Sequence, residues 1–91
     1  MNSRVPVVIE WNDPAGEKIV ERAFTRIVGP YGCMVVLPQN LSITQNLRVT
    51  NTANDNAIAG VVVWKGNQGT DGWELGIELT EPGMDFWGIE L

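Results

Sequence analysis

The stretch WELGIEL, residues 73–79, alternates large apolar side chains with glutamate and glycine. Trp73, Leu75, Ile77 and Leu79 occupy every second position, which is the period of a β-strand that buries one of its two faces. The same period recurs in several other segments, whereas no long segment has the 3.6-residue period of a helix. The sequence therefore predicts a protein built of β-strands.

Turn-forming residues divide the chain into six expected strands. These strands span residues 5–11, 18–28, 33–37, 47–50, 57–64 and 73–79. Residues 12–17, 38–46 and 51–56 are expected to be turns or loops, and residues 65–72 a wide hairpin loop. Short strands with frequent turn signals indicate a small antiparallel barrel or sandwich. We favour an all-β, six-stranded antiparallel β-barrel, because closure removes exposed strand edges, and expect residues 1–91 to form one domain.

The longest expected strand, residues 18–28, has an apolar and a polar side. Val20, Phe24 and Val28 are set against Glu21 and Thr25. Because a strand directs successive side chains to opposite faces, this pattern predicts that the three apolar residues share the buried face.

The C-terminal residues 81–91 combine a bend signal with an apolar cluster. Phe86, Trp87, Ile89 and Leu91 follow a Pro-Gly pair within a short distance. We expect this tail to make one helical turn and to fold back on the barrel, because an exposed apolar cluster invites association. Display of the cluster to a partner is the alternative.

The amino-acid composition restricts the kinds of binding partner and the cellular compartment that we expect. Six basic residues stand against eleven acidic ones, for a net charge of −5, which disfavours binding to nucleic acid or to an anionic membrane. The N-terminal apolar run is too short for a signal peptide or a membrane span. A single cysteine allows no internal disulfide and suits a reducing compartment. We therefore expect a soluble, cytoplasmic protein with no membrane and no nucleic-acid partner.

The residue inventory argues against an enzyme. The chain has no histidine and one cysteine, Cys33, so the commonest general base and the usual zinc ligand sets are missing. Glu74 and Glu78 lie on one strand face about 13 Å apart, farther than glycosidase carboxylates. We expect no catalytic residue, no metal site and no cofactor, and a packing role for Cys33.

Four tryptophans in a short chain raise the question of a stacking platform for bases or sugars. Trp64 and Trp73 flank the expected hairpin loop, so a cross-strand aromatic pair is the favoured interpretation. A solvent-exposed cluster of the four would favour binding of single-stranded nucleic acid, and burial would count against it.

The turn IVGPYGC, residues 27–33, carries little chemistry. Gly29, Pro30 and Gly32 indicate a chain reversal, because glycine accepts positive φ and proline fixes φ near a turn value. The only polar side-chain group that the turn offers to a ligand is the phenol of Tyr31.

Several strings resemble the PilZ domain family over nearly the whole chain. They are RVPVVIEW (4–11), VGPYGCMVVLP (28–38), AIAGVVVWKG (57–66) and WELGIELTEPGMDFWGIEL (73–91), and the last two are the most specific. The resemblance implies a six-stranded antiparallel barrel. It also implies a bacterial protein, because many family members are receptors for the messenger cyclic di-GMP.

Receptors of this family have two binding motifs, which the chain retains only in part. The second arginine of Arg-x-x-x-Arg falls on Arg4, and the first would precede the chain. In Asp/Asn-x-Ser-x-x-Gly, Gly32 matches the glycine, but Ile27 and Gly29 replace the polar residues. Arg4 and Gly32 are therefore the candidate ligand-binding residues, and we expect cyclic di-GMP to bind weakly or not at all.

Arg22 and Arg26 also spell Arg-x-x-x-Arg, but within an expected strand. Their side chains would lie on one face about 13 Å apart, so they are expected to pair with surface carboxylates instead of forming a clamp.

Three functions follow from these observations. The favoured one is a non-enzymatic, PilZ-like protein-interaction module in bacterial signalling or motility. A cyclic di-GMP receptor that uses Arg4 and noncanonical contacts is the alternative. A small barrel that binds single-stranded nucleic acid through tryptophan is the third.

Overall fold

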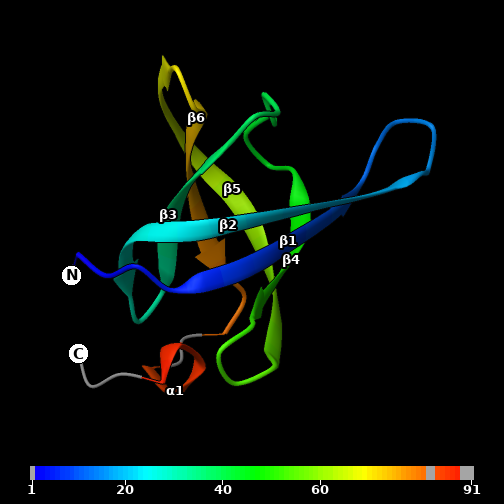
Figure 1. Cartoon of the computed structure of the whole chain (residues 1–91). Coiled ribbons are helices and arrows are strands. Elements are labelled where there is room, and N and C mark those ends of the chain that lie inside the picture. The colour runs from blue at the N-terminus through cyan, green and yellow to red at the C-terminus, as the bar shows by residue number, and fades with distance from the viewer. Residues whose placement is uncertain (1, 82–83, 89–91) are drawn as a thin grey trace.

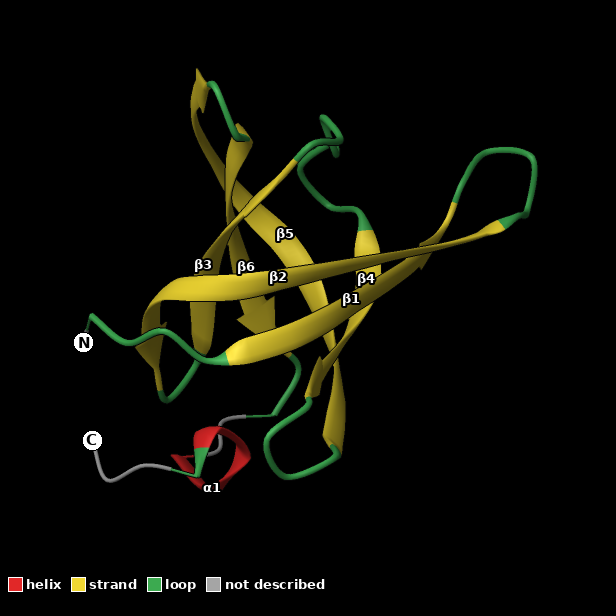
Figure 2. Cartoon of the chain, viewed as in Figure 1, coloured by secondary structure: helices red, strands yellow, loops and turns green. Residues whose placement is uncertain are grey.

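A computed structural model describes residues 2–81 and 84–88 and contains a closed barrel of six antiparallel strands (Figures 1 and 2). The strand order around the barrel is β1-β2-β3-β6-β5-β4. The prediction of a six-stranded antiparallel barrel is confirmed. The elements are β1 (Pro6–Asn12), β2 (Lys18–Gly29), β3 (Gly32–Leu37), β4 (Asn46–Asn51), β5 (Asn56–Gly69), β6 (Gly72–Leu79) and α1 (Met84–Trp87).

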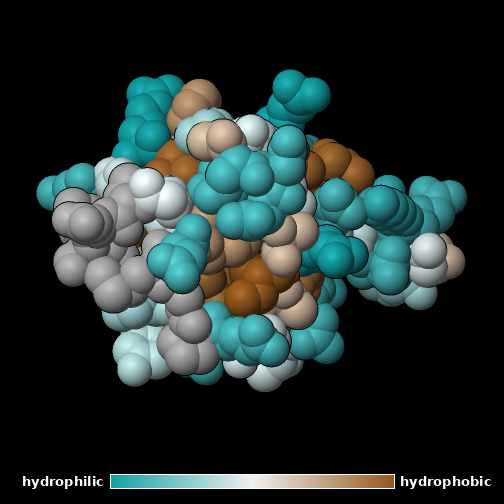
Figure 3. Space-filling model, turned by 90° about the horizontal axis from the view of Figure 1, so that it is seen from below, coloured by the Kyte–Doolittle hydropathy of each residue, from teal (hydrophilic) through white to brown (hydrophobic). Residues whose placement is uncertain are grey.

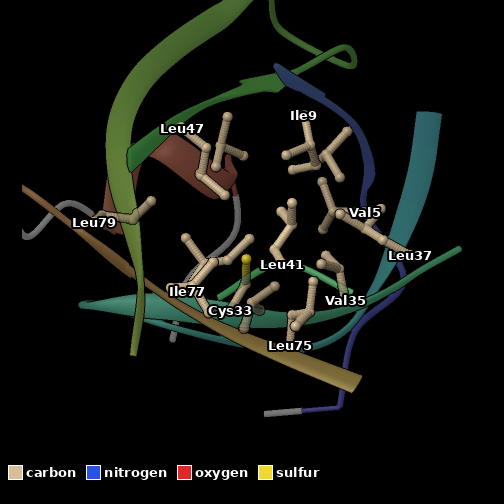
Figure 4. Close-up of a cluster of buried hydrophobic side chains, with 14 of the residues drawn as sticks. Val5, Ile9, Cys33, Val35, Leu37, Leu41, Leu47, Leu75, Ile77 and Leu79 are labelled. Carbon is tan, nitrogen blue, oxygen red and sulfur yellow. The ribbon is translucent and has the colours of Figure 1, made fainter. Parts of the chain in front are cut away.

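Alternate residues of the strands fill the barrel interior. Val7, Ile9 and Trp11 of β1 are buried, as are Leu75 and Ile77 of β6. Figure 4 shows such side chains converging from different strands onto one core. Burying each large aliphatic side chain contributes about 1.5–3 kcal/mol, so the period-two pattern of the sequence is also the source of the stability.

The prediction that Val20 and Phe24 lie on the buried face of β2 is wrong. Val20 and Phe24 are exposed, while Thr25 is buried with 1% of its surface accessible. A β-bulge between Thr25 and Ile27 shifts the register against β3. A bulge adds one residue to a strand and reverses the faces beyond it. Val28 therefore points inward although it shares sequence parity with Phe24.

The prediction of a wide hairpin loop at residues 65–72 is also wrong. β5 continues to Gly69, which pairs with Gly72 across a two-residue turn. Two register shifts, at Val62/Trp64 and Lys65/Gln68, interrupt the alternation of β5. These irregularities, together with the polar side chains of this solvent-exposed hairpin, interrupt the alternation of apolar and polar residues from which a strand is predicted.

The β1–β2 hairpin extends beyond the body of the barrel (Figure 2). Its tip contains Asp13, whose carboxylate accepts a hydrogen bond from the Glu17 N–H at 2.8 Å. Lys18 Nζ lies 2.9 Å from Glu10 Oε2. In Figure 3 this tip forms a mostly hydrophilic projection.

The C-terminal helical turn packs against the barrel end. Phe86 and Trp87 are buried, and their rings meet edge to face with centroids 4.8 Å apart. The buried Asn51 donates from Nδ2 to Phe86 O at 2.8 Å. The prediction that the tail folds back is confirmed for these two aromatic residues, whereas Ile89 and Leu91 lie outside the described residues. Within residues 2–81 and 84–88, no helix has the length and apolar character needed to cross a membrane.

Candidate functional site

The β2–β3 turn has the expected reversal, but only one of its two glycines, Gly32, is required, and for a different reason. Gly29 pairs with Gly32, and neither has a positive φ. A Cβ atom on Gly32 would collide with the backbone carbonyl of Ile77 on β6, whereas one on Gly29 would meet no atom. Gly32 therefore permits the close approach of β3 and β6.

The structure also shows where Ile27 and Gly29 lie, the two other positions that the resemblance aligns with the turn motif. Ile27, which the resemblance aligns with Asp or Asn, is 43% exposed and lies outside the core. Gly29 O accepts a hydrogen bond from Trp87 Nε1 at 2.9 Å. The turn is thus fixed to the C-terminal helical turn.

A buried hydroxyl, that of Thr25, helps to attach the N-terminal arm to β2. Thr25 Oγ1 accepts from the Val5 N–H at 2.8 Å and donates to Ser3 O at 2.7 Å. The Thr25 N–H donates to Val5 O at 2.9 Å. These three bonds hold the residues on both sides of Arg4, which fixes the path of the arm.

Arg4 lies over the ring of Phe24, with Cζ 4.2 Å from the ring centroid. A cation at this distance is attracted by the face of an aromatic ring. Phe24 itself is 49% exposed. The pair therefore forms a solvent-facing combination of a positive charge and an apolar ring.

A groove of about 650 Å³ runs beside this pair. Arg26 also lines it, with Nη2 at 3.8 Å from Asp71 Oδ2 at the β5–β6 turn. The described lining residues are Asn2, Ser3, Arg4, Phe24, Thr25, Arg26, Val36 and Asp71. The groove is thus bordered by two arginines and one carboxylate.

A second hollow, of about 440 Å³, also borders Phe24. Pro6 and Val8 of β1 and Arg22 of β2 line it, and the register places Pro6 opposite Phe24 and Val8 opposite Arg22. We call the outward surface formed by Arg4, Pro6, Val8, Arg22, Phe24 and Arg26 the Phe24 face.

The structure does not bring the two predicted site residues into one groove. Arg4 lines the groove on the outside of β2, and Gly32 is not among the described residues that line it. Sequence reasoning missed Phe24 and Thr25, because the bulge in β2 reverses their expected exposure. Arg26 has a carboxylate neighbour, as predicted, while Arg22 has no ion pair with the described residues.

The tryptophans do not form an exposed cluster. Trp11 and Trp87 are buried and Trp73 is partly buried, whereas Trp64 is exposed. The predicted Trp64–Trp73 pair is wrong, because the register shifts place Trp64 opposite Gly76. This arrangement offers no stacking platform among the described tryptophans.

The described residues offer few groups for nucleophilic catalysis or for metal binding. Burial raises the pKa of the Cys33 thiol to about 12, because the thiolate would lose its hydration. Within the described part of the chain, no group of three or more Cys, Asp or Glu side chains could hold a metal ion. Glu74 Oε1 instead accepts a hydrogen bond from the Asn67 N–H at 2.9 Å.

Comparisons of the chain with protein-family models, with curated proteins and with solved structures find no match.

Proposed function

We propose that this chain is a non-enzymatic PilZ-like barrel that binds a protein partner through the Phe24 face. The observation that carries the proposal is the exposed ring of Phe24 among Arg4, Arg22 and Arg26. Aromatic and arginine side chains contribute much of the affinity of protein interfaces. An apolar centre with a polar rim is typical of such a surface.

The chemistry of the chain supports binding over catalysis. It has no histidine, and its single thiol is buried with a raised pKa. The grooves beside Phe24 are lined by arginine, apolar and neutral polar side chains, with Asp71 as the carboxylate at the border. Such a lining can orient a partner, and its carboxylate, Asp71, lies 3.8 Å from Arg26.

The resemblance to PilZ domains supports a place in bacterial signalling or motility, in the cytoplasm. It rests on the strings quoted above, of which residues 57–66 and 73–91 are the most specific.

Affinity capture from the source organism with matched variants tests the proposal. Phe24→Ser removes the exposed ring, and Val63→Ser is the control, because Val63 is 46% exposed on another strand. A partner retained by the wild type and by Val63→Ser, but lost with Phe24→Ser, is the expected result. Equal retention by both variants would contradict the proposal.

A cyclic di-GMP receptor is the second candidate, and the groove beside Arg4 favours it. The Thr25 bonds hold the backbone on both sides of Arg4, the Arg4 guanidinium lies over the Phe24 ring, and Arg26 lines the same groove. Arginine binds phosphate through paired hydrogen bonds. Calorimetric titration of the wild type and of Arg4→Ala distinguishes this candidate, because micromolar binding that Arg4→Ala abolishes would support it.

A further inference from the structure

One edge of β2 lacks a neighbouring strand, although the barrel as a whole is closed. β1 pairs with β2 along Lys18–Phe24. β3 pairs with β2 only from Thr25 onward. Residues 18–23 therefore have a strand on one side and an open edge on the other, where the β1–β2 hairpin leaves the barrel (Figure 2).

The alternation of hydrogen bonds along β2 identifies which backbone N–H and C=O groups face this open edge. The Thr25 N–H donates to the carbonyl of Val5, the residue immediately before β1. In an antiparallel ladder alternate residues bond to the same neighbour, so the odd-numbered residues of β2 bond to β1. Val20 and Arg22 consequently direct their N–H and C=O groups to the open edge, where the described residues provide no partner.

Charge on the outward side of this edge opposes pairing with a second copy. The outward side chains are Lys18, Val20, Arg22 and Phe24, followed by Arg26 near the bulge. Antiparallel self-pairing centred on Arg22 would place Arg22 opposite itself, and centring on Val20 would place Lys18 opposite Arg22. Like charges directly opposite each other are destabilising.

The same charge favours an acidic strand. Arg22 forms no ion pair with the described residues, and the neighbouring Glu21 accepts a hydrogen bond from Gln39 Nε2 at 2.6 Å. A carboxylate opposite Arg22 would be well placed for bidentate binding. Apolar side chains opposite Val20 and Phe24 would cover the exposed apolar surface on either side.

The cationic stretch is short. Lys18 at one end already has Glu10 at 2.9 Å, and Arg26 at the other has Asp71 at 3.8 Å. A long polyanion would extend past these acidic side chains, whereas a strand of a few residues with one carboxylate would not. This favours a peptide segment over nucleic acid.

We propose that β2 binds an acidic strand of a partner protein at the open edge of Lys18–Ala23, with the pattern apolar–x–acidic–x–apolar. The added strand extends the sheet by main-chain hydrogen bonds to Val20 and Arg22. The proposal rests on the proposed function, because it specifies how a partner engages the Phe24 face.

Amide exchange followed by NMR on the full chain tests the edge directly. The probes are the peptide acetyl-Thr-Val-Thr-Glu-Thr-Val-Thr-amide at millimolar concentration and the matched peptide with a central lysine. With the glutamate peptide, we expect exchange of the Val20 and Arg22 amides to slow several-fold, while the amides of the odd-numbered residues, already bonded to β1, change little. The lysine peptide should bind at least about tenfold more weakly.

Two variants separate the main-chain and charge contributions. Val20→Pro removes an edge N–H without touching the bonds to β1 and should abolish binding of the glutamate peptide. Arg22→Glu should reverse the preference, so that the lysine peptide binds more tightly. Arg48→Glu, on β4 and separated from β2 by β1, is the control and should keep the wild-type preference.

Equal binding of the two peptides, or no change in exchange at Val20 and Arg22, would overturn the proposal. Concentration-dependent dimerisation that Val20→Pro abolishes would assign the edge to a second copy and would also overturn it. Partner capture that survives Val20→Pro but not Phe24→Ser would reject the added strand and leave the proposed function intact. If Val20→Pro and Phe24→Ser both still capture the partner, the proposed function itself is rejected.

Discussion

Trp87 Nε1 donates a hydrogen bond to Gly29 O at 2.9 Å, joining residues 58 positions apart. The bond connects the C-terminal helical turn to the β2–β3 turn. Two asparagines add to the attachment, because Asn51 Nδ2 and Asn54 Nδ2 both donate to Phe86 O. The helical turn Met84–Trp87 is therefore part of the folded domain and not an appendage.

Removing the Phe86 ring should destabilise the whole domain. Phe86 is buried against Trp87 and the barrel end, so Phe86→Ala should cost about 3–5 kcal/mol of unfolding free energy. Tyr31→Ala is the control, because Tyr31 is 65% exposed and its truncation should cost little. Urea denaturation measures both. An unchanged midpoint for Phe86→Ala would return the tail to a partner-binding role.

The two glycines of the β2–β3 turn should respond differently to substitution. Gly32→Ala places a Cβ against the Ile77 carbonyl and should cost about 1–3 kcal/mol through overpacking. Gly29→Ala meets no atom, and its unfolding free energy should change by less than about 1 kcal/mol. Denaturation of the pair is the measurement, and equal effects would show that the β3–β6 approach does not require Gly32.

The sequence was sufficient to predict most strands, because alternation in segments such as residues 5–11 and 73–79 reflects burial directly. It failed where a bulge inserts a residue, as at Thr25 in β2 and at Lys65 in β5, since one added residue reverses the faces. The candidate site was harder still. The position of Arg4 depends on Thr25, more than twenty residues away, and no local pattern encodes that contact.

The stability of the domain should fall in alkaline solution, in part through Cys33. Burial raises the pKa of its thiol from 9.0 to about 12. Between these values the unfolded chain releases a proton that the folded chain keeps, so unfolding becomes easier as the pH rises. The contribution is fully present below pH 9.0 and decreases above it by up to about 1.4 kcal/mol per pH unit.

Comparing the wild type with Cys33→Ala isolates this contribution, because every other titratable group is the same in the two proteins. Urea denaturation at about pH 8 and about pH 10.5 should show a steeper loss of stability for the wild type. Parallel losses in the two proteins would mean that the thiol ionises equally in the folded and unfolded states.

Cyclic di-GMP should bind weakly or not at all. In the alignment that the PilZ resemblance implies, Ile27 and Gly29 replace the polar residues of the turn, and Arg26 already has Asp71 as a neighbour. Each missing hydrogen bond to a charged group removes about 1.5–3 kcal/mol, and several such losses turn a micromolar ligand into one weaker than millimolar. Calorimetry measures this, and a dissociation constant below about 10 μM would contradict it.

Restoring the motif should create measurable binding of cyclic di-GMP. The repaired chain carries Ile27→Asp, Gly29→Ser and an added arginine four positions before Arg4. The structure favours tolerance of both substitutions, because the Ile27 side chain is exposed and a Cβ on Gly29 meets no atom. The Thr25 bonds that hold the arm should also position the extension.

The repaired chain should therefore unfold near the wild-type urea midpoint and bind with a micromolar dissociation constant. A matched chain with lysine at the added position should bind less tightly, because lysine cannot make the forked contact of arginine. If the repaired chain folds and still does not bind the ligand in calorimetry, the alignment of Arg4 and Gly32 with the PilZ motif positions is wrong. In that case the resemblance would support the barrel architecture alone.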